Sequence, residues 1–269
     1  MSATPPISRP VTVPEFRAAK ARGEKLAVIT AYDYTSARLA DDAGADCLLV
    51  GDSLGMVIQG HATALPVTLG QVAYHTACVV RGTRRALVVA DLPFLSYQVS
   101  PRQAVRSAGR LLKKAGAHAV KLEGGVRMAE TVRAVVNAGI PVMGHVGLTP
   151  QSVHQLGGFK VQRDAESLLA DARAVEEAGA FSLVVESVPA EIGAAITKAV
   201  SVPTIGIGAG ANCDGQVLVY HDLLGLFTDF TPKFVKRYAD VGSQIREALA
   251  AYCKDVRAGS FPDAQHSFR

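Results

Sequence analysis

Short apolar segments that each end in a charged or ionisable residue recur along this chain, and they constrain its fold more than any other feature. A run of four or five apolar residues is typical of a strand buried on both faces of a parallel sheet. The carboxyl ends of such strands lie at one edge of the sheet, where α/β folds carry their active sites. The mixture of acids with Lys and His at these ends predicts a metal-assisted enzyme. The runs end at Asp52, Asp91, Lys121 with Glu123, His145 and Glu186.

A weak internal repeat indicates that helices alternate with these strands. The sequence Ala-Gly-Ala occurs at 43–45, 115–117 and 178–180, each time just before an apolar run. Glycine at such a position ends a helix by adopting the left-handed conformation, and the next strand follows after a short link. The repeat is therefore the second half of a recurring β-α unit.

About eight alternations in 269 residues predict an α/β fold, a (β/α)8 TIM barrel with an extra N-terminal helix over 12–21 that closes its bottom. An open doubly wound sheet is the alternative. We expect one domain over 1–269, with loosely ordered ends at 1–10 and 259–269. The expected strands are 26–30, 46–51, 86–91, 118–122, 141–145, 182–186, 203–207 and 216–219. The other expected helices are 34–43, 69–81, 101–115, 127–138, 164–178, 190–199 and 234–256.

The helix that starts after Ser100 has the strongest start signal in the chain. Ser100 is a suitable N-cap, Pro101 fits the first helical position, and Gln103 would complete a capping box.

Composition and charge argue against several classes of protein. The net charge of +4 is modest, and the basic clusters at 83–85 and 233–237 accompany no nucleic-acid motif. No apolar stretch approaches the roughly 20 residues that cross a bilayer, and residues 1–10 lack the apolar region of a signal peptide. The four cysteines form no C-x-x-C pair. We expect a cytoplasmic protein that binds neither membranes nor nucleic acid.

Three of the strand-end acids have the chemistry of a magnesium site. Asp52 and Asp91 each follow an apolar run, and Glu123 follows a third, so their carboxylates should face one barrel mouth. Hard six-coordinate cations such as Mg²⁺ prefer oxygen ligands of this kind. The alternative for either aspartate, and especially for Asp52, is the N-cap of a following helix.

The remaining strand-end residues each allow a catalytic and a structural interpretation. Lys121 and Glu123 point to the same side, so Lys121 faces an anionic ligand or forms an ion pair with Glu123. His145 could donate to a substrate carboxylate or be a core histidine. Glu186 could be a general base or a helix cap. The glycine-rich segment 206–210 lies where barrels often hold phosphate, but glycines also allow close packing.

Long motifs in this sequence resemble those of the ketopantoate hydroxymethyltransferase family, over nearly the whole chain. They include Val-Gly-Asp-Ser-Leu-Gly-Met at 50–56, Ala-Asp-Leu-Pro-Phe at 90–94 and Val-Lys-Leu-Glu-Gly-Gly at 120–125. They continue with Gly-His-Val-Gly-Leu-Thr-Pro-Gln at 144–151 and Gly-Gly-Phe-Lys-Val-Gln at 157–162. The segment 185–189 departs from the common family form at Ser187.

The resemblance implies a Mg²⁺-dependent barrel of the phosphoenolpyruvate/pyruvate-type superfamily. The implied reaction moves a hydroxymethyl group from 5,10-methylenetetrahydrofolate to 3-methyl-2-oxobutanoate, giving 2-dehydropantoate through a Mg-stabilised enolate. This is the first committed step of pantothenate and coenzyme A biosynthesis. Family members form homodecamers built as pentamers of dimers. The implied metal ligands are Asp52, Asp91 and Glu123, the keto-acid contacts are Asp52, Ser53, Asp91, Lys121 and His145, and the proton acceptor is Glu186.

Two other functions remain open from the residues. One is a metal-dependent carbon–carbon lyase acting on a 2-hydroxy or 2-keto acid on the same scaffold, although no cysteine-bearing segment suited to acid catalysis is evident. The other is a catalytically inactive barrel that serves as a binding protein. Asp52, Asp91, Lys121 and Glu186 are all present, which disfavours the inactive barrel.

Overall fold

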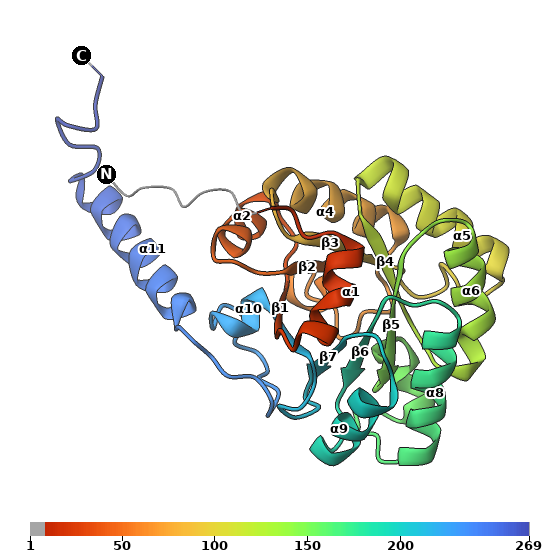
Figure 1. Ribbon diagram of the computed structural model, residues 1–269. Coiled ribbons are helices and arrows are strands. Elements are labelled where there is room, and N and C mark those ends of the chain that lie inside the picture. Colours follow the sequence, from red (N-terminus) through yellow and green to blue (C-terminus); the bar gives the residue numbers. More distant parts are fainter. Residues whose placement is uncertain (1–8, 269) are drawn as a thin grey trace. The chain divides into compact units, whose positions relative to one another are not determined.

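Eight parallel strands close into a barrel in the computed structural model, which describes residues 9–268 (Figure 1). Each strand pairs with the next in the sequence, and the last pairs with the first, with Val28 opposite Val217. The predicted (β/α)8 TIM barrel is confirmed, and the open sheet is ruled out. The strands are β1 (Leu26–Thr30), β2 (Cys47–Val50), β3 (Leu87–Asp91), β4 (Ala119–Glu123), β5 (Val142–Gly147), β6 (Ser182–Glu186), β7 (Thr204–Ile207) and β8 (Gly215–Val219).

The helices within residues 34–199 follow the strands and surround the barrel (Figure 1). The α-helices are α1 (Val13–Arg22), α2 (Tyr34–Asp42), α3 (Leu54–Val57), α4 (Leu69–Gly82), α5 (Pro101–Arg110), α6 (Ala129–Asn137), α7 (Val153–Leu156), α8 (Ala165–Glu177), α9 (Ala190–Ala199), α10 (Tyr220–Leu223) and α11 (Val241–Ala258). A π-helical turn, Leu111–Ala115, continues α5, and short 3₁₀ turns lie at Val126–Met128 and Pro150–Ser152.

Two local expectations need correction. Ser100 caps α5 by accepting from the Gln103 N–H at 3.2 Å, but the Gln103 side chain accepts from the Val99 N–H instead of completing a capping box. The last helix begins at 241 rather than 234. The N–H groups of Tyr238 and Val241 donate to carbonyls at the end of α10, which diverts this segment from the helical bonding pattern.

Alternation along the strands separates two hydrophobic cores. Val88 and Ala90 of β3 belong to the core that includes the surrounding helices, whereas Leu87 and Val89 belong to the core inside the barrel. Because successive side chains on a strand point to opposite faces, Asp91 continues the inward series at the strand end. The same alternation in β4 carries Lys121 and Glu123 to the interior.

The first helix, α1, covers the bottom of the barrel, as predicted. Thr12 and Glu15 form a capping box at its start. Phe16 and Ala19 of α1 are buried and belong to the core inside the barrel. The ring of Phe16 meets that of Phe181 edge-on, with centroids 5.9 Å apart.

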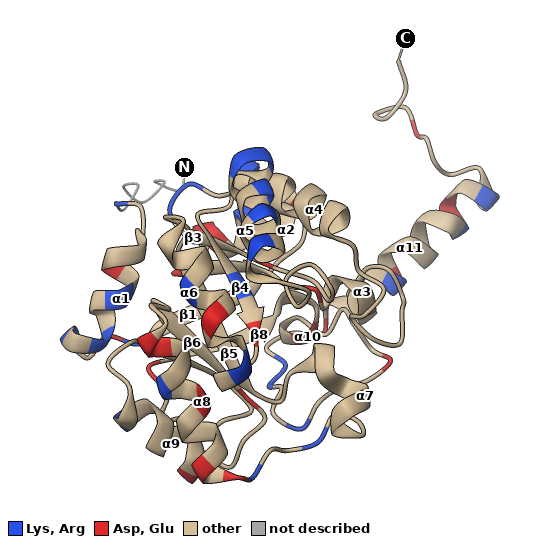
Figure 2. Cartoon of the chain, turned by 90° about the vertical axis from the view of Figure 1, so that its right-hand side faces the viewer, with Lys and Arg blue, Asp and Glu red and all other residues tan. Residues whose placement is uncertain are grey.

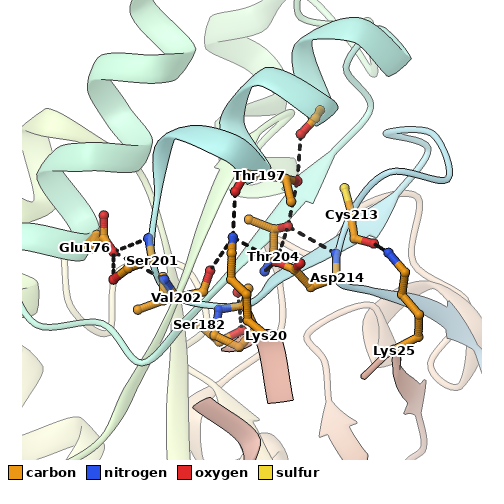
Figure 3. A network of polar contacts seen from close by, with 12 residues as sticks. Lys20, Lys25, Glu176, Ser182, Thr197, Ser201, Val202, Thr204, Cys213 and Asp214 are labelled. Carbon is orange, nitrogen blue, oxygen red and sulfur yellow. Dashed lines mark hydrogen bonds and ion pairs between the residues drawn. The ribbon is translucent and has the colours of Figure 1, made fainter. Parts of the chain in front are cut away.

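Lys20 of α1 contacts α9 and the segments that precede β7 and β8 (Figure 3). Lys20 Nζ donates to the carbonyls of Thr197 at 2.6 Å and Val202 at 3.2 Å, and it pairs with Asp214 at 3.0 Å. Asp214 in turn accepts from the backbone N–H of Thr204 at 2.9 Å. The Lys20 and Asp214 side chains are only 18% and 15% exposed, so this ion pair is poorly screened by water.

Basic residues recur along α5, where the ribbon is marked in blue (Figure 2). Arg102, Arg106 and Arg110 recur every four residues and are exposed, whereas Ala104 and Ala108 on the opposite face are buried. The helix is therefore amphipathic, with its apolar face in the core and its charged face in solvent.

The chain divides into two compact units, residues 1–219 with the barrel and residues 220–269 with α10 and α11. In the second unit, the Phe261 ring lies 5.6 Å from that of Tyr252. A single domain over 1–269 with loosely ordered ends stays a prediction, and residues 1–8 and 269 of those ends lie outside the described residues. None of the helices within 9–268 has the length and apolar character needed to cross a bilayer.

We predict that Lys20→Met lowers the free energy of unfolding by about 2 kcal/mol, because it leaves the largely buried Asp214 carboxylate and two carbonyls without their cationic donor. Denaturant titration measures the change. Arg22→Met is the matched control, since Arg22 lies on the same helix and pairs with Glu24 in solvent. Equal free energies of unfolding for Lys20→Met and the wild-type protein would show that the Lys20 contacts do not stabilise the fold.

Candidate active site

The strand-end residues identified in the sequence converge at the carboxyl-terminal mouth of the barrel. Strand register places Asp91 opposite Lys121, Glu123 opposite His145, and Gly147 opposite Glu186. Asp52 lies two residues after the end of β2 and reaches the same cluster. Five of these ionisable side chains are buried, and the sixth, Glu186, is the most accessible at 16% exposure.

A continuous series of polar contacts joins strands β3 to β6. Lys121 Nζ lies 2.7 Å from Asp91 Oδ1 and 3.3 Å from His145 Nδ1. His145 Nδ1 lies 3.5 Å from Glu123 Oε1, and His145 Nε2 lies 3.1 Å from Glu186 Oε2. The imidazole therefore connects the buried carboxylates to the one nearest the opening.

These contacts discriminate between the structural interpretations left open above. Lys121 pairs with Asp91 at 2.7 Å, so it is not a simple partner of Glu123. His145 contacts two carboxylates and an ammonium, which is no ordinary core environment. Asp52 and Glu186 do not cap helices: Ser53 and Pro189 occupy the N-cap positions of α3 and α9.

A close approach of the backbone holds Asp52 against Asp91. The Asp52 N–H donates to Asp91 Oδ2 at 3.0 Å. The chain is also closely packed at Gly51, where a Cβ would lie 2.8 Å from Ser53 Oγ and 3.1 Å from Thr30 Cγ2. The Ser53 hydroxyl lies 2.7 Å from that of Tyr32, which is fully buried, so this side of the cluster is also tightly packed.

Burial and mutual repulsion perturb the acids of this cluster in different directions. Loss of water raises the pKa of Asp52 well above its usual value, and the neighbouring Asp91 and Glu123 carboxylates raise it further. Burial also raises the pKa of Asp91, although Lys121 opposes the shift. Burial acts in the same sense on Glu123, but hydrogen bonding to His145 and the charges of His145 and Lys121 outweigh it and lower the pKa of Glu123.

Both basic groups of the cluster are held in their charged forms. Burial alone would lower the pKa of Lys121, but Asp91, Glu123 and Asp52 together raise it above the ordinary lysine value. Burial and Lys121 would likewise lower the pKa of His145, but bonds to Glu123 and Glu186 raise it to about 9. The cluster thus holds an ammonium and an imidazolium among four carboxyl groups.

The donor set fits a hard divalent cation. Asp52, Asp91 and Glu123 are three buried carboxylates at the ends of neighbouring strands, and the charges of Asp91 and Glu123 add to burial in raising the Asp52 pKa. In the described residues no three His, Cys, Asp or Glu side chains are grouped closely enough to hold a metal ion as they stand, and Lys121 and the Gln151 amide contact Asp91 and Asp52.

Two residues of the site were not singled out by sequence reasoning. Gln151 lies within the conspicuous 144–151 motif and donates through Nε2 to Asp52 Oδ2 at 2.8 Å. The buried Tyr97 hydroxyl lies 2.8 Å from Gln151 Oε1. Position in the motif could have marked Gln151. Tyr97 lies in the loop after β3, where no local pattern indicates a buried partner.

A cavity of about 240 Å³ opens beside the cluster. Glu123 and Gln151 form its inner wall, and Phe94, Arg127 and Met128 are among the residues farther out. A ligand in this cavity would have direct access to the buried carboxylates.

The glycine-rich segment 206–210 is used for close packing. A Cβ at Gly206 would lie 3.0 Å from both Cys213 Sγ and Gln216 Nε2. Gln216 Nε2 also donates to the Gly210 carbonyl at 2.9 Å. These contacts favour packing as the reason for the glycines.

Ser187, where the sequence departs from the common family form, has a left-handed backbone with a φ of 49°. This conformation is uncommon outside glycine. Its N–H donates to the Ile207 carbonyl at 2.8 Å, and its carbonyl accepts from Gln162 at 2.9 Å. These two bonds fix the chain direction immediately after Glu186.

Comparison with known proteins gives consistent matches over nearly the full length. A family model described as ketopantoate hydroxymethyltransferase matches residues 10–264. A 3-methyl-2-oxobutanoate hydroxymethyltransferase from Moorella thermoacetica is 60% identical over 263 residues, 96% of this chain and 98% of that protein. One of the same name from Clostridium beijerinckii is 55% identical over 262 residues, with 96% and 95% covered.

Solved structures share the fold at low sequence identity. A 2,3-dimethylmalate lyase, a member of the PEP mutase/isocitrate lyase superfamily, matches with a TM-score of 0.60 and 18% identity over 95% of this chain and 91% of its own. A phosphonopyruvate hydrolase in complex with oxalate and Mg²⁺ matches with a TM-score of 0.59 and 15% identity, covering 95% and 93%. These structures confirm the expected barrel fold.

We predict that His145 of the metal-free protein is protonated at pH 7 and titrates near pH 9, observed by NMR of its ring carbons. Because this pKa lies above the ordinary 6.5, the stability that His145 contributes is complete below pH 6.5 and is lost as the pH rises through about 9. Glu123→Gln, which removes one charged acceptor, should lower the pKa. Titration of the wild-type residue at or below pH 6.5 would contradict this electrostatic arrangement.

Proposed function

This chain belongs to the ketopantoate hydroxymethyltransferase family, and we propose that it transfers a hydroxymethyl group from 5,10-methylenetetrahydrofolate to 3-methyl-2-oxobutanoate. The product would be 2-dehydropantoate, so the reaction would be the first committed step of pantothenate and coenzyme A biosynthesis. The observation that carries the proposal is the series of contacts from the buried carboxylates through His145 to the more accessible Glu186.

Glu186 is the proposed general base. It is the most accessible carboxylate of the cluster, and its Oε2 lies 3.1 Å from His145 Nε2. This contact leaves Oε1 available for a proton on the substrate carbon next to the keto group. Proton removal leaves an electron pair on that carbon, which forms a bond to the methylene carbon of the folate donor as one of its two carbon–nitrogen bonds breaks. Water then replaces the other nitrogen on the methylene carbon and supplies the hydroxyl group, the two nitrogens take up protons, and tetrahydrofolate leaves.

The cations of the cluster suit an anionic keto acid. Lys121 and His145 are both held in their charged forms, and cationic donors can bind a carboxylate and stabilise negative charge that develops on the keto oxygen. Ser53 lies beside them with a hydroxyl held by Tyr32. We therefore propose that the substrate contacts Ser53, Lys121 and His145, together with Asp52 and Asp91.

Asp52, Asp91 and Glu123 are the residues that we propose to hold Mg²⁺. When bound there, the ion would supply Lewis-acid polarisation of the keto oxygen. The support is that three buried carboxylates lie together at the ends of adjacent strands. The fold neighbour in complex with oxalate and Mg²⁺ is consistent with this assignment.

We propose that the folate donor approaches through the cavity beside Glu123 and Gln151. Its inner wall is part of the cluster, so a molecule in the cavity can reach a substrate held there. Phe94 and Met128 offer apolar surface for a flat ring, and Arg127 is a cation suited to the carboxylates of the donor's glutamate tail.

The second compact unit supports a proposal of self-association. Ile245, Leu249, Tyr252 and Val256 of α11 are between 42% and 59% exposed, and their spacing places them on one face of the helix. Such an apolar stripe suits burial against another chain. We propose a homo-oligomer, a homodecamer by family resemblance.

We also propose a cytoplasmic location. All four cysteines, Cys47, Cys78, Cys213 and Cys253, are free thiols, as suits a reducing compartment.

We predict that Glu186→Gln retains keto-acid binding but slows deuterium exchange at the substrate's reactive carbon by about 100-fold or more, because an amide cannot accept the proton. Proton NMR of the keto acid in deuterated buffer, without folate, measures this step alone. Glu191→Gln is the matched control, since Glu191 is exposed on α9. Undiminished exchange in Glu186→Gln would falsify the assignment of the base.

We predict that Arg127→Gln raises the KM for the folate donor about tenfold, because the variant loses a charge-assisted contact with the glutamate tail. Deuterium exchange in the keto acid alone should be unchanged. Arg133→Gln, an exposed change on α6, serves as the control. An unchanged KM for the donor would exclude this approach route while leaving the proton-transfer chemistry intact.

A further inference from the structure

Gln151 contacts two of the three carboxylates proposed to hold the metal. Its side-chain Nε2 donates to Asp52 Oδ2 at 2.8 Å, and its backbone N–H donates to Glu123 Oε2 at 3.0 Å. Nε2 also donates to the Leu92 carbonyl at 3.0 Å. Gln151 is only 6% exposed, so these bonds are formed away from competing water.

The surroundings allow only one orientation of the Gln151 amide. On the Nε2 side lie two acceptors, Asp52 Oδ2 and the Leu92 carbonyl. On the Oε1 side lie two donors, the Tyr97 hydroxyl at 2.8 Å and the Gln98 amide at 2.9 Å. A flipped amide would set oxygen against a carboxylate and NH₂ against the Gln98 NH₂, and both arrangements are repulsive.

Tyr97 is the fixed point of this arrangement. Its hydroxyl accepts from the Glu123 backbone N–H at 3.1 Å, and its proton can go to Gln151 Oε1 at 2.8 Å or to the Glu123 carbonyl at 3.2 Å, the first being the shorter contact. The side chain is 1% exposed and therefore has little freedom to move. The end of β4 thus determines where the phenol points, and the phenol determines which way the amide points.

Asp52 Oδ2 and Glu123 Oε2 accept from N–H donors of Gln151, so the other oxygen of each carboxylate, Asp52 Oδ1 or Glu123 Oε1, is the one directed away from Gln151. Glu123 Oε1 lies 3.5 Å from His145 Nδ1. Holding a carboxylate in one rotamer before a ligand arrives removes an ordering cost from binding. Gln151 acts on both groups from a single residue, so it also sets their spacing.

We propose that Gln151, held by Tyr97, is a positioning residue that orients Asp52 and Glu123 for a divalent cation. This inference rests on the metal site of the proposed function. Gln151 acts through the two carboxylates, and Tyr97 acts through Gln151. A residue that merely filled space would support folding without setting the affinity for a cation.

The test measures Mn²⁺ affinity of the full-length protein by electron paramagnetic resonance, without keto acid or folate. Gln151→Met keeps the side-chain volume but removes the amide, and it should raise the dissociation constant about tenfold. Tyr97→Phe removes one of the two donors to Oε1 and should raise it about threefold. The double variant should bind no more weakly than Gln151→Met, because Tyr97 has no amide left to orient.

Gln155→Met is the matched control, since Gln155 lies exposed four residues along the same segment, and its Mn²⁺ affinity should equal that of the wild-type protein. Thermal unfolding confirms that each variant is folded at the titration temperature. If Gln151→Met does not fold, Tyr97→Phe decides the question.

Three results would overturn all or part of the inference, and they can be told apart. If the wild-type protein binds Mn²⁺, and folded Gln151→Met and Tyr97→Phe bind it with the same affinity, only the positioning role is excluded. Absence of Mn²⁺ binding by the wild-type protein would remove the proposed metal site, and the positioning role with it. Additive losses in the double variant would show that Tyr97 does not act through Gln151.

Discussion

Charges that water cannot reach must be balanced by one another, and this constraint determines the arrangement of the whole barrel mouth. Asp52, Asp91, Lys121, Glu123 and His145 are all at most 5% exposed. Removing Lys121 or His145 would leave buried carboxylates without a cationic partner, which costs several kcal/mol in typical proteins. The cluster is therefore one electrostatic unit, with Glu186 as the member nearest to solvent.

The strands of the barrel bring this unit together because their inward-facing positions follow one pattern. Inward positions hold apolar side chains along most of each strand, as in Leu87 and Val89 of β3, and ionisable ones at the end. The apolar layer beneath the cluster excludes water from below, while the closed sheet satisfies the backbone around it. The apolar side chains that stabilise the barrel and the ionisable side chains of the candidate active site thus lie in successive layers of the same strands.

Sequence reasoning identified the features that follow from local pattern. Alternation and strand ends led to Asp91, Lys121 and Glu186, because the period of a strand fixes the face on which a side chain lies. The Gln151 contact to Asp52 spans 99 positions, and no local rule connects two loops at that separation. The same holds for the start of α11, which depends on bonds to the end of α10. The charge of His145 depends on distances that exist only after folding.

The bond between Lys20 and the Thr197 carbonyl joins residues 177 positions apart, and its bond to Val202 spans 182. A growing chain emerges from the ribosome with its amino terminus first, so α1 is synthesised long before its partners exist. The base of the barrel can be sealed only after β7 has been made, and such distant contacts slow folding. Until then, the apolar side of α1 has no permanent cover, and nascent chains of this protein should depend on chaperones during most of their synthesis.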